Sequence, residues 1–354
     1  MKVAFAGGGT GGHVSPALGL AEAVAGGGGK TLFLCSFRSA PAFAARLSGL
    51  KWENVPSAPF RLKSPWSLPR SLAANWTGYR RSLRLLEDFS PAVLVATGGY
   101  PSVPPALAAG KLGIPVVLYE ANTSLGKANR LLLARARGVL RALPPEDGGG
   151  KNLLVVPAVP AAALAGERAK RSEAGSLTLL VMGGSHGARD VNRLVVSCLP
   201  AWYGYEERLK FIHLCGTGME EGIAEAYREV GFPARVVPFA ERMGEIYAAA
   251  DLVVSRAGAA SLAEILRWKL PAILVPYPYA TDDHQERNAR CLERAGAALV
   301  CPQGKDAGRR LAHLVEELAG NPGRCREMAA AAGKVISPEF PSALEGLQLL
   351  LRGS

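Results

Sequence analysis

Cysteine is scarce in this chain, and its six cysteines are scattered. They stand at positions 35, 198, 215, 291, 301 and 325, with no CxxC pair and no His/Cys cluster at zinc spacing. Neither a disulfide scaffold nor a zinc site is therefore indicated, and we expect reduced, buried thiols and no bound metal.

Long uninterrupted apolar runs are also missing. Four prolines break the longest window without a charged residue, residues 91–110, and the amino terminus has too short an apolar core for a secretory signal. We therefore expect a cytoplasmic protein without a transmembrane helix. Apolar residues make up 49% and charged residues 20% of the 354 residues, which is typical of a globular chain with room for two domains.

Acidic residues are few in the first half of the chain. Residues 1–160 hold 18 Lys and Arg against 7 Asp and Glu, whereas residues 161–354 hold 23 of each kind. The whole net charge of +11 thus lies in the first half, which indicates an anionic partner for that half. Nucleic acid, anionic lipid and a phosphorylated substrate all fit this charge.

Short apolar, β-branched runs alternate with Ala/Leu-rich helical patterns along the whole chain. The runs are KVAFAG, TLFLCS, VLVATG and PVVLYE in the first half, then LTLLVMGG, KFIHLCG, RVVPFA, LVVSRAG and AILVPYP in the second. This alternation predicts βαβ units on parallel sheets, and its fresh start predicts two doubly wound α/β domains. Residues 145–170, rich in Pro, Gly and small side chains, are expected to form the hinge.

A glycine-rich turn follows the first strand of each predicted domain, GGGTGGH at residues 7–13 and GGSHGA at residues 183–188. Glycines let a ligand approach the backbone, and the following helix offers free N–H groups to a diphosphate. Two Rossmann-like domains facing across a cleft would bring both turns to it at strand carboxyl ends. An NAD-dependent dehydrogenase is not indicated, because Cys35, Ser36 and Phe37 stand where an acidic residue would end the second strand.

Further polar residues stand at predicted strand carboxyl ends. His13 opens the first helix, where the helix dipole favours the neutral imidazole of a general base, although a histidine bonded to its own turn fits the position too. The SRAGAASLAE segment at residues 255–264 clears the start of another helix, and its Glu264 could accept two ribose hydroxyls or remain an exposed helix glutamate. The TDDHQERNA segment at residues 281–289 adds a polar cluster after the next strand.

Seven segments, in this order and at these separations, carry a resemblance to a known family: GGGTGGHVSPALGLAEA, TGGYPSVPPALAA, GIPVVLYEAN, GGSHGARDVN, SRAGAASLAEI, LPAILVPYP and DHQERNA. Over residues 2–300 the chain resembles the bacterial undecaprenyldiphospho-muramoylpentapeptide β-N-acetylglucosaminyltransferases. The portion from SRAGA to DHQ is shared with a broader set of UDP-sugar glycosyltransferases.

The resemblance implies a GT-B fold in three parts: residues 1–160 as the acceptor- and membrane-facing domain, 161–337 as the UDP-sugar-binding domain, and 338–354 as a helix returning to the first domain. The implied reaction is the inverting, metal-independent transfer of N-acetylglucosamine from UDP-N-acetylglucosamine to the C4 hydroxyl of the muramoyl sugar in lipid I. It needs no cofactor and gives UDP and lipid II, a peptidoglycan precursor. Such an enzyme works peripherally at the cytoplasmic face of the bacterial cell membrane.

The resemblance also implies roles for individual residues. His13 matches the candidate catalytic base, and His13 and Tyr100 match the acceptor side of the cleft. Glu264 would take the ribose hydroxyls, Gln285 would bind the donor sugar, and the backbone of Ala240 would lie against the uracil. The whole donor-binding set is Thr10, Gly11, Gly12, Asn122, Ser185, Ala240, Ala259, Ala260, Ser261, Leu262, Ala263, Glu264 and Gln285.

The chain departs from the family pattern at two places. The family usually has a Gly-Asn-Pro-Val-Arg turn before the hinge, whose arginine approaches the donor phosphates, but residues 156–160 read VPAVP. Charge on the leaving UDP would then be stabilised by helix amino termini or by another cation such as Arg256 or Arg189. His186 also stands where glutamine is common, and it would either alter the diphosphate pocket or be a tolerated exposed side chain.

Residues 60–89 mix Trp66, Leu72 and Trp76 with six Lys and Arg. This mixture fits contact with an anionic lipid leaflet, and it fits equally a solvated helix whose apolar side is core. No recognisable nucleic-acid module accompanies the charge, so no nucleic-acid partner is expected. Alternatives to the lipid I reaction are a UDP-sugar transferase with another lipid or small-molecule acceptor, a UDP-N-acetylglucosamine 2-epimerase, and a non-catalytic nucleotide-sugar- or lipid-binding module.

Overall fold

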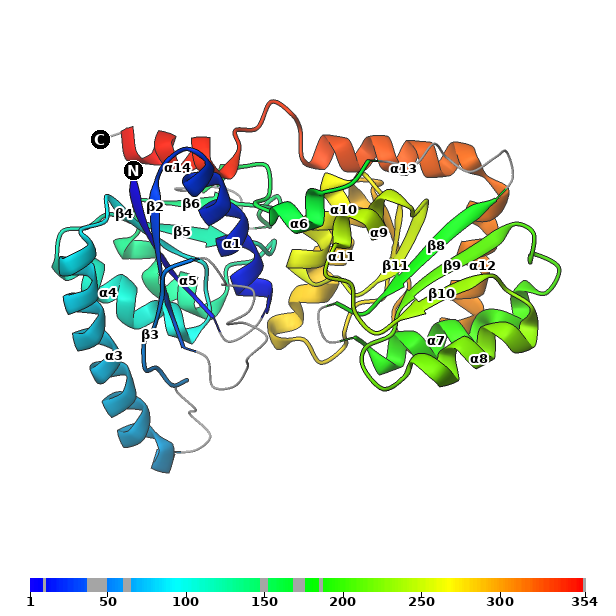
Figure 1. The fold of residues 1–354 in the computed structure, drawn as a ribbon, viewed down its shortest axis with the longest axis horizontal. Coiled ribbons are helices and arrows are strands. Elements are labelled where there is room, and N and C mark those ends of the chain that lie inside the picture. The colour runs from blue at the N-terminus through cyan, green and yellow to red at the C-terminus, as the bar shows by residue number, and fades with distance from the viewer. Residues whose placement is uncertain are drawn as a thin grey trace. The chain divides into compact units, whose positions relative to one another are not determined.

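The computed structural model describes residues 1–8, 11–36, 50–59, 65–146, 152–167, 176–184 and 187–352 of the chain. The chain divides into two compact units, each built on its own parallel sheet (Figure 1). Unit 1 comprises residues 1–160 and 339–354, and unit 2 comprises residues 161–338. Within the described ranges, no helix combines the length and the apolar character needed to span a bilayer.

Unit 1 has a seven-stranded sheet in the order β3-β2-β1-β4-β5-β6-β7. Its central strands are continuous apolar runs because helices cover both faces. Helices α1 and α14 pack on the face of Val3 and Phe5, and α3, α4 and α5 pack on the face of Ala4 and Ala6. The elements are β1 (Lys2–Ala6), α1 (Gly11–Gly26), β2 (Lys30–Cys35), β3 (Trp52–Asn54), η1 (Pro65–Ser67), α3 (Leu68–Phe89), β4 (Val93–Ala96), η2 (Tyr100–Ser102), α4 (Val103–Lys111), β5 (Val116–Glu120), α5 (Lys127–Leu132), η3 (Leu133–Arg135), β6 (Gly138–Arg141), β7 (Asn152–Leu154) and α14 (Ala343–Arg352).

Unit 2 has a six-stranded sheet in the order β10-β9-β8-β11-β12-β13, which repeats the doubly wound order of unit 1. Leu179 and Val181 of β8 pack in one large core with residues of α7, α8 and α12. The elements are α6 (Ala161–Leu164), β8 (Leu177–Met182), α7 (Arg189–Cys198), η4 (Leu199–Trp202), β9 (Leu209–Leu214), α8 (Glu220–Val230), β10 (Ala234–Val237), α9 (Met243–Ala248), β11 (Leu252–Ser255), α10 (Ala259–Arg267), β12 (Ala272–Leu274), η5 (Thr281–Asp283), α11 (His284–Arg294), β13 (Ala298–Val300), α12 (Ala307–Gly320) and α13 (Pro322–Val335).

The carboxyl-terminal helix α14 is fastened to unit 1, where it lies beside α1 (Figure 1). Arg137 donates from Nε to the carbonyl oxygen of Leu350 at 2.6 Å and from Nη2 to that of Leu351 at 3.1 Å. Leu350 packs closely on Gly138. A Cβ at position 138 would come within 2.7 Å of the leucine Cδ2. The helix is therefore held at its last turn by hydrogen bonds and by close packing.

All nine apolar runs identified in the sequence form strands. The expected hinge, residues 145–170, is not irregular throughout, because it contains strand β7 at the sheet edge and the short helix α6. Residues 156–160 are also fixed to unit 1: Val156 pairs with Ser342, and the Ala158 N–H donates to the Tyr119 hydroxyl at 3.0 Å. Gly19 of α1 makes room for Val159, since a Cβ there would lie 2.6 Å from the valine nitrogen.

Candidate functional site

The candidate residues of unit 1 lie at the carboxyl ends of β1 and β4, which are neighbours in the sheet. The turn after β1 has no room for a side chain at Gly7, because the Thr97 hydroxyl occupies that space. Gly11, Gly12 and His13 form the first turn of α1, so the sequence-predicted turn does open a helix. Thr10 lies outside the described residues.

His13 is held in one tautomer by the end of β4. Its Nδ1 lies 3.0 Å from the carbonyl oxygen of Thr97. Because a carbonyl oxygen only accepts, Nδ1 carries the hydrogen, and the lone pair of the neutral ring is on Nε2. Gly98 allows this close approach for two reasons. Its φ of 95° is a conformation that favours glycine, and a Cβ at this position would lie only 3.1 Å from Nδ1. The half-buried ring is therefore oriented to take up a proton at Nε2.

Tyr100 lies close to His13 in the same unit. It follows Gly99, which has a φ of 74° and whose Cβ, if present, would lie 3.2 Å from Cδ2 of His13. The tyrosine is half-buried at the start of η2. The structure thus brings His13, in the first turn of α1, and Tyr100, at the start of η2, together at the carboxyl ends of β1 and β4.

Asn122 is positioned by a buried carboxylate at the end of β5. Glu120 Oε1 accepts hydrogen bonds from the backbone N–H and the Nδ2 of Asn122, at 3.1 and 2.9 Å. Its Oε2 accepts from the N–H of Gly126 and from Nδ2 of Asn129, each at 2.9 Å. Four donors thus replace water around Glu120, which is 3% exposed, and they fix the loop that presents Asn122.

The candidate residues of unit 2 lie at the carboxyl ends of β8, β11 and β12, which are neighbours in the second sheet. The second glycine turn joins β8 to α7, and Gly184 and Gly187 take positive φ values of 91° and 73°. Ser185 and His186 lie outside the described residues. Arg189, at the first position of α7, is exposed.

Helix α10 begins directly after the SRAG turn, as the sequence predicted. Ala259, Ala260 and Ser261 are its first three residues, whose N–H groups have no acceptor within an α-helix. The N–H of Leu262 already donates to the carbonyl oxygen of Gly258 at 3.0 Å. The side chains of Leu262 and Ala263 are buried in the core, so the candidate binding groups of this segment are the backbone N–H groups at the start of the helix.

Glu264 is oriented by a buried tyrosine. The hydroxyl of Tyr247 donates to Glu264 Oε2 at 2.8 Å. Burial, reinforced by the charge of Glu264, raises the pKa of Tyr247 well above its usual value of 10. The tyrosine therefore stays protonated and remains a donor, which fixes the half-buried carboxylate two turns into α10.

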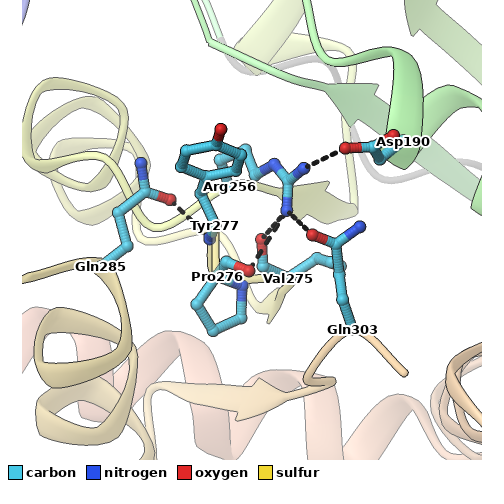
Figure 2. A network of polar contacts seen from close by, with 7 residues as sticks. All are labelled: Asp190, Arg256, Val275, Pro276, Tyr277, Gln285 and Gln303. Atoms are coloured by element: carbon cyan, nitrogen blue, oxygen red, sulfur yellow. Dashed lines mark hydrogen bonds and ion pairs between the residues drawn. The ribbon is translucent and has the colours of Figure 1, made fainter. Parts of the chain in front are cut away.

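Gln285 and Ala240 lie on two further loops of unit 2. Gln285, in the first turn of α11, accepts the Tyr277 N–H at Oε1 over 3.0 Å (Figure 2). The carboxamide oxygen is thereby used, and its NH2 group is the part left to donate. Ala240 is half-buried on the loop after β10, next to Phe239, whose side chain is 49% exposed.

Comparison with known proteins identifies the family. Models of the glycosyltransferase family 28 N-terminal and C-terminal domains match residues 3–141 and 178–344. A UDP-N-acetylglucosamine--N-acetylmuramyl-(pentapeptide) pyrophosphoryl-undecaprenol N-acetylglucosamine transferase of Halothermothrix orenii is 35% identical, covering 96% of this chain and 95% of the relative. Its counterpart in Chelativorans sp. is 37% identical, covering 94% and 90%. The chain belongs to this transferase family.

Solved structures give the fold of this transferase. The crystal structure of Acinetobacter baumannii MurG matches it with a TM-score of 0.78 and 28% identity, covering 100% of this chain and 99% of that one. The glycosyltransferase of kitacinnamycin matches with a TM-score of 0.72 at 16% identity, covering 99% and 97%, which shows the fold alone. The predicted pair of Rossmann-like, parallel-sheet domains of a GT-B glycosyltransferase is confirmed.

The sequence assigned no role to two buried residues beside the candidate residues of unit 1, Glu120 and Asn129. Glu120 is the last residue of an apolar strand run, and Asn129 lies nine positions further on, so only the fold shows that they meet. Arg256 was one of two cations considered for the leaving UDP. The residue is 6% exposed, and its guanidinium donates to the carbonyl oxygens of Val275 and Pro276 (Figure 2).

Proposed function

We propose that this transferase moves N-acetylglucosamine from UDP-N-acetylglucosamine to the C4 hydroxyl of the muramoyl sugar in lipid I, giving lipid II and UDP with inversion. The observation that carries the proposal is the tautomer of His13, whose Nε2 is the basic nitrogen at the carboxyl end of β1. The similar proteins of the family carry the corresponding name. Residues 1–160 would bind the acceptor, residues 161–337 the UDP-sugar, and the two would face each other across a cleft, with residues 338–354 returning to the first domain.

The reaction uses His13 as the general base. Nε2 takes the proton of the C4 hydroxyl while the hydroxyl oxygen attacks the anomeric carbon. The bond between that carbon and the β-phosphate oxygen breaks, and its electron pair leaves with UDP. Negative charge on the leaving group is stabilised by the amino-terminal N–H groups of α1, α7 and α10, with Thr10, Gly11, Gly12 and Ser185 near the phosphates. Tyr100 lies beside the base on the acceptor side.

The donor is held by groups whose orientation the fold sets. Glu264, fixed by the Tyr247 hydroxyl, accepts the two ribose hydroxyls. Gln285 donates its carboxamide NH2 to the sugar because its oxygen is used by Tyr277. Asn122, held by Glu120, contacts the sugar from unit 1. The remaining contacts are made by two segments. The backbone of Ala240, on the loop after β10, lies against the uracil, and the start of α10 contributes Ala259, Ala260, Ser261, Leu262 and Ala263.

The test is UDP release from UDP-N-acetylglucosamine, without added metal, in the presence and absence of a short-chain lipid I analogue. We expect acceptor-dependent release and a product heavier by one N-acetylhexosamine. Release with diacylglycerol instead, epimerisation without any acceptor, or donor binding without turnover would each replace the proposal with one of the alternatives named above.

The role of His13 is tested by His13→Ala. We expect turnover to fall by about 100-fold or more, the usual contribution of a general base, with the affinity for UDP kept within about twofold. His313→Ala, which removes an exposed histidine of α12, is the matched control. Unchanged turnover in His13→Ala would remove this residue from the mechanism.

We further propose that α3 and the turn before it meet the anionic cytoplasmic leaflet that contains lipid I. Trp66, Leu72 and Trp76 are 93%, 59% and 60% exposed, whereas Ser71, Gly78, Ser82 and Leu86 are the buried residues of α3, with Leu83, Leu85 and Phe89 packed against the core beside them. The three exposed side chains are therefore not core. Arg70, Arg80 and Arg84 are exposed on the same helix, and each basic residue near such a surface contributes about 1 kcal/mol. Residues 60–64 lie outside the described part.

Vesicle flotation tests the membrane contact. We expect binding to vesicles with anionic lipid, weak binding to zwitterionic vesicles, and a clear loss of binding in Trp66→Ser/Trp76→Ser. Tyr203→Ser is the control, because Tyr203 is an 80% exposed aromatic residue of unit 2. Equal loss in the control, or binding that does not depend on anionic lipid, would contradict the assignment of this surface.

A further inference from the structure

Arg256 is a cation that the fold has withdrawn from water. It is the first residue after β11, and 6% of its surface is exposed. Burial lowers the pKa of its guanidinium from the usual 12.5, and the nearby carboxylate of Asp190 opposes that shift. Arginine nevertheless stays charged in proteins, so a full positive charge is buried here and needs oxygen partners.

The partners of Arg256 come from three other segments of unit 2 (Figure 2). Nη1 donates to the carbonyl oxygens of Val275 and Pro276, each at 3.2 Å, and to Oε1 of Gln303 at 2.8 Å. Nη2 lies 3.5 Å from Oδ2 of Asp190, in the first turn of α7. One guanidinium thus joins the loops after β11, β12 and β13 to the helix that follows the second glycine turn.

An aromatic ring covers the same guanidinium. The centroid of the Tyr277 ring lies 5.3 Å from Cζ of Arg256, a cation–π contact. The backbone N–H of Tyr277 is the group that fixes the carboxamide of Gln285. Arg256 therefore determines where segment 275–277 lies, and that segment determines which way the Gln285 amide points.

We propose that Arg256 is a positioning residue for the donor sugar, holding segment 275–277 so that Gln285 presents its NH2 group, and that it does not itself bind the diphosphate. The two hydrogens of Nη1 are shared among three protein oxygens, Nη2 faces the Asp190 carboxylate, and Tyr277 covers one face of the guanidinium. The proposal rests on the proposed function, because it takes Gln285 as a donor-sugar contact. It also answers the question raised by residues 156–160: Arg256 does not replace the family arginine that is missing there.

Lysine cannot take over this role. A guanidinium presents donors in a fixed planar fork and stacks on an aromatic ring, whereas an ammonium is a single strongly hydrated point. Arg256→Lys therefore keeps the charge while it loses the geometry. Gln303→Leu is a second variant, which keeps the arginine and removes one of its acceptors. Arg137→Lys is the matched control, since Arg137 also donates to backbone carbonyl oxygens, but in unit 1.

Two measurements test the proposal. Amide hydrogen exchange in residues 275–287 needs no ligand, and we expect it to become about tenfold faster in Arg256→Lys as this segment opens locally. Calorimetry with UDP and with UDP-N-acetylglucosamine should show the ratio of the two dissociation constants shifting about fivefold against the sugar nucleotide, the cost of one hydrogen bond. Gln303→Leu should shift both readouts in the same direction by less, and Arg137→Lys should leave both unchanged.

The double variant Arg256→Lys/Gln285→Ala completes the test. If Arg256 acts through Gln285, the double variant has the same ligand ratio as Gln285→Ala alone. Equal weakening of UDP and UDP-N-acetylglucosamine, unchanged exchange in residues 275–287, or additive effects in the double variant would each overturn the proposal. Failure of the proposed function would show elsewhere, in wild-type enzyme that does not bind UDP-N-acetylglucosamine or turn it over with lipid I.

Discussion

Acid should destabilise unit 2 through one buried histidine, His213 of β9. The side chain is fully buried, its Nε2 lies 3.1 Å from Oδ1 of Asn192, and its Nδ1 lies 3.0 Å from the Tyr227 hydroxyl. An amide oxygen only accepts, so Nε2 carries the hydrogen and Nδ1 accepts from Tyr227. Burial lowers the pKa of this imidazole from 6.5 to about 4.

The magnitude follows from proton uptake by the unfolded chain. Between pH 6.5 and pH 4 the unfolded state binds a proton at this histidine and the folded state does not, so stability is fully present above this window and is lost as the pH falls through it. The pKa difference corresponds to about 3 kcal/mol in total, of which about 2 kcal/mol is lost by pH 5.

The assay compares wild type with His213→Gln at pH 8 and pH 5. Glutamine offers a donor and an acceptor but does not titrate. The pH dependence contributed by all other titratable groups is the same in both proteins and cancels in the comparison. Urea unfolding, followed by pulsed hydrogen exchange of peptides from β9, reports unit 2 alone. Wild type should lose about 2 kcal/mol more than the variant between the two pH values, and His313→Gln should behave as wild type. Identical pH dependence in wild type and His213→Gln would refute the reasoning.

Three further changes have definite expected outcomes. Tyr247→Phe removes the hydroxyl that fixes Glu264, so the affinities for UDP and 2′-deoxy-UDP should converge in calorimetry. Glu120→Gln places an NH2 group against N–H donors, so urea unfolding of unit 1 should show a loss of about 3 kcal/mol. Gly138→Ala places a Cβ within 2.7 Å of the α14 leucine above it, so limited proteolysis should release the carboxyl-terminal helix faster than in wild type, and an unchanged rate would contradict that packing.

The strands of both sheets were predictable where they are buried on both faces. β4 and β5 are buried at every residue, and such runs differ clearly from the helical patterns beside them. Strands β3, β6, β7 and β13 were not predicted. β3, β7 and β13 are three-residue strands at sheet edges, and β6 reads GVLR, whose glycine and arginine break the apolar run although every residue is buried. β3 reads WEN and lies at a sheet edge, so the pairing partner rather than the local sequence makes it a strand.

The candidate site was predictable as a set of loops but not as a set of bonds. The glycine turns and the polar residues after strands indicated that His13, Glu264 and Gln285 lie at carboxyl ends. The tautomer of His13 depends on a carbonyl group 84 residues away, and the orientation of Gln285 depends on a backbone N–H eight residues before it. Such contacts depend on the order of the strands in the sheet and on the conformation of the loops. Neither can be predicted from a local sequence pattern.

Among the described residues, Glu120 in unit 1 and Arg256 in unit 2 are buried charges whose partners are mainly loop groups. Glu120 is surrounded by four N–H donors, and Arg256 by three carbonyl oxygens and the exposed Asp190. An unpaired buried charge is costly. The loops that bind Glu120 and Arg256 therefore cannot move away from these charges without a large loss of stability. Variants of these two residues should therefore lose stability and ligand affinity together, whereas variants of half-exposed groups such as His13 and Gln285 should lose turnover or affinity alone. Measuring both quantities in one set of variants separates residues that hold the site from residues that touch the ligand.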